Sequence, residues 1–191
     1  MSYYKVLLFL HIATAVIWLG SGFFVQMLVL RAEKTSDRLL LKQFSGHSAW
    51  LAQRIFIPAS LAVLVLGILL TIEGPWSFDQ LWIVLGLVGY AISFLVGILF
   101  IEPEGKRIHG AMEAHGAESP QAAFHIGRIN VVSRMELVVL YLVVYVMALK
   151  PTSADTGTLV VAAAAALAAL AYGVPRLRAA APSASAPAVA D

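Results

Sequence analysis

Long runs of apolar residues that contain no charged side chain dominate the pattern along the chain. Three such runs, at residues 6–30, 55–72 and 81–101, contain no Asp, Glu, Lys or Arg. A hydrocarbon core of roughly 30 Å takes about 20 helical residues to cross, so each run predicts a membrane-spanning helix. We expect these spans to cover about residues 4–30, 50–72 and 80–101.

A fourth span is less regular, because the uncharged run 137–149 is too short to cross alone. The span must be extended to about 125–149, which brings Arg134 and Glu136 into it. An ionisable residue near the bilayer centre costs about 2.5 to 3.5 kcal/mol, so both side chains are expected to face protein or trapped water. The Ala-rich segment 158–174 predicts a fifth span within residues 152–178.

Composition supports the same fold class. Of the 191 residues, 60% are hydrophobic and 13% are charged, whereas soluble domains are about a quarter charged. The expected fold is an all-α integral membrane helical bundle, with four core helices in residues 1–151 and a fifth helix after them. Residues 179–191 have no periodicity and are expected to be disordered. The absence of cysteine excludes disulfides and thiolate chemistry.

Basic residues predict the orientation, because they cluster at one end of the proposed spans. By the positive-inside rule the N-terminus and the 73–79 loop face outward, and the basic loops face the cytoplasm. We expect the protein to lie in the inner (plasma) membrane of the cell. The net charge of +2 is then a topology signal, and no basic stripe with interleaved aromatic residues indicates nucleic-acid binding. The basic residues at the cytoplasmic ends are Arg31, Lys34, Arg38, Lys42, Lys106, Arg107, Arg128, Arg176 and Arg178, against Lys5 and Lys150 at the other end.

His11 is the first candidate for chemistry, because it lies about two turns inside an otherwise uncharged helix. Its helix face continues through Ala15, Trp18, Gly22 and Gln26, whose small members would let another helix or a flat ligand approach. Three interpretations stay open for His11: an interhelical hydrogen bond, a haem or metal ligand, and a proton relay.

Two further histidines are candidate axial ligands. His47 lies seven residues before Arg54 on one helix face, and His125 begins the fourth span. Histidines from two helices of a bundle can together hold a haem, although hydration at the membrane surface also explains their positions. His109 and His115 lie in an expected polar loop with Glu102, Glu104, Glu113 and Glu118, at a spacing that fits no standard metal site.

The charged pair of the fourth span also has candidate roles. Arg134 is expected to face inward, where a guanidinium could hold a porphyrin propionate or a structural carboxylate. Glu136 is two positions further on, so it points away around the helix and is expected to meet a partner from another helix, with Arg54 as one candidate.

Three motifs together resemble a known group of small bacterial membrane proteins. They are His11-x6-Trp18-x-Gly20 within residues 3–24, Arg54-Ile-Phe-Ile-Pro58-Ala in the second span, and Arg134-Met-Glu136 followed by Lys150-Pro151. Over residues 3–151 they resemble the HemJ-type protoporphyrinogen oxidases and the CopD copper-resistance proteins. The third span departs from the HemJ pattern, because residues 80–91 contain neither lysine nor histidine.

The resemblance implies haem b with His11 as an iron ligand, in a membrane protein of electron transfer or porphyrin-linked redox chemistry. Such a protein could be an accessory subunit of a membrane oxidoreductase, and an electron donor or acceptor would be its partner besides the lipid bilayer. Copper or other metal transport and a structural subunit without cofactor are the alternatives, and no catalytic residue is assigned. The candidate cofactor-binding residues are His11, Trp18, Arg54, Arg134, Glu136, His47 and His125, of which His47 and His125 are alternative iron ligands.

Overall fold

The computed structural model describes residues 2–35, 50–116 and 118–179, and every regular element in these ranges is helical. His47 and the tail after residue 179 lie outside the described residues. The elements are α1 (Tyr3–Thr35), the π-helical turn η1 (Ala52–Phe56), α3 (Ile57–Glu73), α4 (Leu81–Val96), the π-helical turn η2 (Gly97–Ile101), α5 (Glu102–His115), α6 (Pro120–Leu149) and α7 (Thr156–Ala179).

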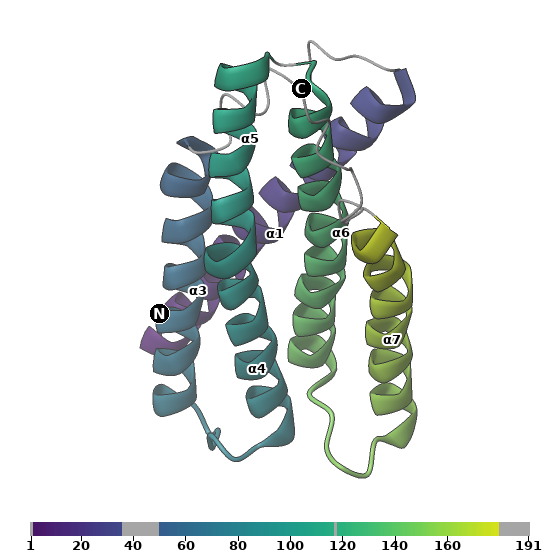
Figure 1. Ribbon diagram of the computed structural model, residues 1–191. Coiled ribbons are helices and arrows are strands. Elements are labelled where there is room, and N and C mark those ends of the chain that lie inside the picture. Colours follow the sequence, from purple (N-terminus) through teal and green to yellow (C-terminus); the bar gives the residue numbers. More distant parts are fainter. Residues whose placement is uncertain (1, 36–49, 117, 180–191) are drawn as a thin grey trace, which may run out of the picture.

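Five helical segments are long and apolar enough to cross a membrane: Tyr3–Ala32, Gln53–Glu73, Leu81–His115, Pro120–Leu149 and Thr156–Ala179. The all-helical membrane bundle expected from the sequence is therefore confirmed. In Figure 1 four of these segments stand side by side, and α1 runs obliquely behind them. The turns after α3 and after α6 lie at one end, whereas α5 and the start of α6 lie at the other, which we call the basic end.

Helix α6 is the centre of the packing, because α1, α4, α5 and α7 all contact it. Glycine residues allow two of these helices, α4 and α7, to pack closely against α6. A side chain at Gly89 on α4 would overlap Val143, and one at Gly173 on α7 would overlap Met135. Close packing of this kind takes the place of the hydrophobic effect between helices, since lipid tails are as apolar as the helix surfaces.

A proline follows shortly after each π-helical turn. η1 ends at Phe56, two residues before Pro58, and η2 ends at Ile101, two residues before Pro103. A proline ring removes one backbone donor and clashes with the carbonyl four residues earlier, so an α-helix cannot continue unchanged through it. Widening the preceding turn relieves that clash without breaking the helix.

The helix through α4, η2 and α5 is continuous for 35 residues, which differs from the expected polar loop after the third span. At 1.5 Å per residue it is roughly 50 Å long and must extend beyond the hydrocarbon core. α6 also begins earlier than expected, at Pro120, because the Ser119 hydroxyl accepts a hydrogen bond from the Ala122 backbone amide at 3.2 Å and caps the helix.

Candidate functional site

His11 on α1 packs into a notch on α3. A Cβ atom at Gly67 would lie 3.2 Å from Cε1 and 3.7 Å from Nδ1 of the imidazole, so only glycine leaves the ring its full space. The Val63 backbone, one turn earlier on α3, also interacts with the ring. Nδ1 is buried and has no hydrogen-bond partner among the described residues. A buried polar nitrogen is normally satisfied, so this one requires an explanation.

Aromatic side chains connect the same face of α1 to α4. The rings of Trp18 and Tyr90 meet edge to face with centroids 5.9 Å apart, and Tyr90 also stacks on Phe94 at 6.0 Å. Ser60 of α3 is the polar side chain that faces the Tyr90 hydroxyl. His11 and Trp18, both predicted as cofactor-binding residues, thus lie on a face of α1 that meets α3 and α4 within the bundle.

Glu136 finds its interhelical partner on α4. The Ser93 hydroxyl donates a hydrogen bond of 2.8 Å to Oε1 of Glu136, and Ser93 is 2% exposed. The expectation of a partner from another helix is therefore confirmed, but the partner is Ser93 and not Arg54. Arg54 is exposed in η1, at the basic end of its span, whereas Glu136 lies in the middle of α6.

Arg134 is directed toward α7. Its Nη1 donates a hydrogen bond of 2.9 Å to the hydroxyl of Tyr172. Arg134 and Glu136 therefore contact different neighbours of α6, as their two-residue spacing requires. His11 packs on α3, whereas Nη1 of Arg134 bonds to α7 and His125 is the sixth residue from the basic end of α6.

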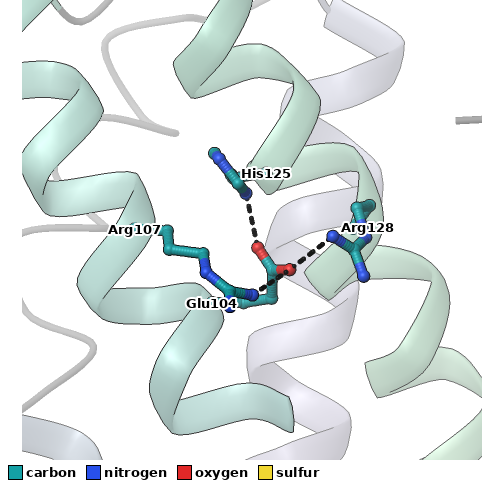
Figure 2. A network of polar contacts seen from close by, with 4 residues as sticks. All are labelled: Glu104, Arg107, His125 and Arg128. Atoms are coloured by element: carbon teal, nitrogen blue, oxygen red, sulfur yellow. Dashed lines mark hydrogen bonds and ion pairs between the residues drawn. The ribbon is translucent and has the colours of Figure 1, made fainter. Parts of the chain in front are cut away.

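The most densely connected polar group lies at the basic end and has Glu104 at its centre (Figure 2). Oε1 of Glu104 is 3.1 Å from Nη1 of Arg107 and 2.8 Å from Nη1 of Arg128, and Oε2 is 2.6 Å from Nδ1 of His125. The Glu104 side chain has no exposed surface. The carboxylate thus has one partner on its own helix and joins α5 to α6 through the other two, and a buried charge needs partners of this kind.

Two guanidinium groups face one carboxylate in this cluster, so its net charge is positive even when His125 is neutral. Arg128 also lies over the rings of Phe100 and Phe124, at 5.2 and 5.6 Å from their centroids. The sequence predicted Glu104 in a polar loop that could bind a divalent ion, and did not predict that it joins two helices. The sequence feature that indicates a buried Glu104 is the helical spacing of Ile101, Glu104 and Ile108. On that face of the helix the carboxylate lies between two apolar residues.

Side chains that could bind a metal ion do not gather in the described ranges. Within residues 2–35, 50–116 and 118–179, no group of three or more His, Asp or Glu side chains could hold a metal ion. Met135 and Met147 fill glycine notches at Gly173 and Gly86, so both thioethers serve helix packing.

Comparison with known proteins identifies the family. Residues 5–151 match the family described as "Predicted integral membrane protein (DUF2269)". No match was found among curated proteins or among solved structures. Because the match covers α1 through α6, the chain belongs to this family of integral membrane proteins, and α7 lies outside the matched region.

Proposed function

We propose that this member of the DUF2269 family binds haem b within the membrane through His11 and passes electrons, as an accessory partner of a membrane oxidoreductase. The observation that carries the proposal is the buried Nδ1 of His11, which has no hydrogen-bond partner in the described structure. Ionisable residues inside a membrane are rare and usually functional. An imidazole nitrogen with a free lone pair is an axial ligand for haem iron.

The surroundings of His11 fit such a role. The Val63 backbone interacts with the imidazole and helps to orient the ring. Gly67 gives the imidazole a fixed seat on α3, and Trp18 and Tyr90 offer aromatic walls nearby. These residues would hold and orient the group and keep water away from it, and the iron would supply the one-electron redox change.

The resemblance of residues 3–151 to the HemJ and CopD group supports the same proposal, since His11 stands at the position where that resemblance implies a haem ligand. The second axial ligand is not assigned. His125 is an alternative ligand, because Glu104 holds its Nδ1 at 2.6 Å and leaves Nε2 for a metal, as carboxylate partners of ligating histidines do. Metal transport is less well supported, because Met135 and Met147 are used in helix packing.

The test is a pyridine haemochrome assay of haem per protein, after expression with added haem precursor and purification in detergent. Wild type, His11→Ala, His125→Ala and His109→Ala are compared. His109 is the matched control, because it is exposed and pairs only with exposed Glu113 among the described residues. We expect haem in wild type and His109→Ala, and its loss in His11→Ala. Loss only in His125→Ala would move the site to the basic end, and a haem-free wild type would overturn the proposal.

A further inference from the structure

A cavity opens at the end of the bundle opposite the basic end. It lies between the turn that joins α3 to α4 and the turn that joins α6 to α7, and its volume is about 470 Å³. This volume falls within the range of small-ligand sites, roughly 300 to 1,000 Å³. Its walls combine apolar residues with one cation, Lys150, and one anion, Asp79.

Lys150 forms the cationic wall, and its backbone is held in an uncommon conformation. It is the one described non-glycine residue with a positive φ, at 47°, in the position after α6 that glycine usually occupies. Its ammonium lies 4.0 Å from the ring centroid of Trp76 and 5.2 Å from that of Trp82. Trp76 is itself anchored, because its indole N–H donates a hydrogen bond of 3.1 Å to the hydroxyl of Tyr4. The cation is therefore positioned by the fold.

Two other polar groups of the cavity, Gln80 and Asp79, offer oxygens that accept hydrogen bonds. Oε1 of Gln80 is buried and has no donor among the described residues, and Asp79 is exposed and makes no salt bridge with them. The Gln80 side chain does not cap α4 either. A ligand that satisfies this cavity must bring an anion to Lys150 and N–H donors to Gln80 and Asp79. A phosphate that carries a nearby primary ammonium has both.

The position of the cavity favours a lipid as the source of that chemistry. It lies where four spans end or begin, and Tyr4, Trp76 and Trp82 mark the level where aromatic residues meet lipid headgroups. Leu81 and Pro151 add apolar surface to its walls. We propose that this cavity binds the headgroup of an aminophospholipid such as phosphatidylethanolamine, with the phosphate at Lys150 and the ammonium at Asp79 and Gln80. The site is separate from His11 and does not depend on a haem.

The test is native mass spectrometry of the full chain in detergent, with added phosphatidylethanolamine, phosphatidylcholine or phosphatidylglycerol of the same acyl chains. We expect preferential retention of phosphatidylethanolamine. Lys150→Gln should lower that retention about fivefold, the equivalent of roughly 1 kcal/mol for one interfacial cation. Lys150→Arg should keep most of it. Lys5→Gln is the matched control, because Lys5 is an exposed cation at the same end of the bundle.

A second variant tests the amine. Gln80→Leu should abolish the preference for phosphatidylethanolamine over phosphatidylglycerol and leave Lys150 in place. Equal retention of the three lipids by wild type, or unchanged retention in Lys150→Gln, would overturn the proposal. Free phosphoethanolamine should not compete with the lipid at equal concentration. If it does, the cavity is a site for a soluble amine phosphate, and the lipid assignment is wrong.

Discussion

His125 and Glu104 join the two helices of the basic end, with Nδ1 of the imidazole 2.6 Å from Oε2 of the carboxylate. The same carboxylate also holds Arg107 and Arg128, so α5 cannot separate from α6 without exposing a charge that is now buried. The contacts of Glu104 with α6 therefore fix the position of α5, the part of the long helix that extends beyond the hydrocarbon core. Figure 2 shows the three partners converging on Glu104 from two elements.

Loss of this charge should destabilise the bundle. Glu104→Gln leaves two guanidinium groups without their shared partner, and we expect the free energy of unfolding to fall by about 2 to 3 kcal/mol. This loss is small for a broken buried ion pair, because the Arg107 side chain is 57% exposed and water can solvate its charge. Unfolding by SDS titration in mixed micelles measures it. Glu113→Gln is the control, since its pair with His109 is exposed, and an equal effect in both variants would contradict a special role for Glu104.

A methyl group at Gly89 should weaken the contact between α4 and α6. It would overlap Val143, a β-branched side chain that has few alternative rotamers. We expect Gly89→Ala to cost about 1 to 3 kcal/mol, as overpacking usually does. At Gly20 a methyl group meets no other element in the described part of the chain, so Gly20→Ala should not lower the unfolding midpoint. Equal stability of the two variants would show that the two helices are not held at this distance.

The conformation of Lys150 predicts an unusual order of stabilities. Lys150→Ala keeps a side chain at a φ of 47° and removes the contacts with Trp76 and Trp82, so it should be destabilising. Lys150→Gly also removes those contacts, but it removes the conformational strain of the left-handed backbone as well. That strain costs a non-glycine residue about 1 to 2 kcal/mol. Thermal unfolding should therefore rank the glycine variant above the alanine variant. The reverse order would mean that the backbone is not left-handed there.

The stability of the first turn of α7 should depend on pH through the carboxylate of Asp155. The backbone N–H and the hydroxyl of Thr152 both donate hydrogen bonds to its carboxylate, and they hold the pKa of Asp155 below its ordinary value of 3.8. A depressed carboxyl pKa contributes stability that is present above the ordinary value and is lost as the pH falls through the lowered one. We expect the Leu159 amide, which donates to the Asp155 carbonyl, to lose protection from hydrogen exchange only in that acidic window.

The matched variant for this effect is Asp155→Asn, which keeps a hydrogen-bonding side chain but cannot titrate. Exchange rates corrected for the intrinsic pH dependence should change in wild type and stay constant in the variant. If the two proteins show the same pH profile, the carboxylate of Asp155 does not control the start of α7.

The spans could be predicted because a membrane imposes a simple rule on composition. Uncharged runs of about 20 residues have few alternatives to a spanning helix. The inward face of the third span follows helical spacing in the same way, since Gly86, Tyr90 and Ser93 lie three or four residues apart and contact Met147, Trp18 and Glu136.

The cluster at the basic end could not be predicted in the same way. Polar residues at 102–115 are typical of both a loop and a helix in water, and only tertiary packing places Glu104 against residues 21 and 24 positions away. The partner of Glu136 was missed for a related reason. Many side chains of an antiparallel bundle are at a suitable depth, and sequence spacing does not say which helices are neighbours.

The most direct test of haem binding at His11 is a reduced-minus-oxidised absorption spectrum of the purified protein, recorded for wild type and for His11→Gly with and without added imidazole. Haem ligation by His11 predicts a b-type signal in wild type, its loss in His11→Gly, and its recovery when imidazole takes the place of the missing side chain. A signal of equal size in wild type and His11→Gly without imidazole would contradict the assignment of His11 as the haem ligand.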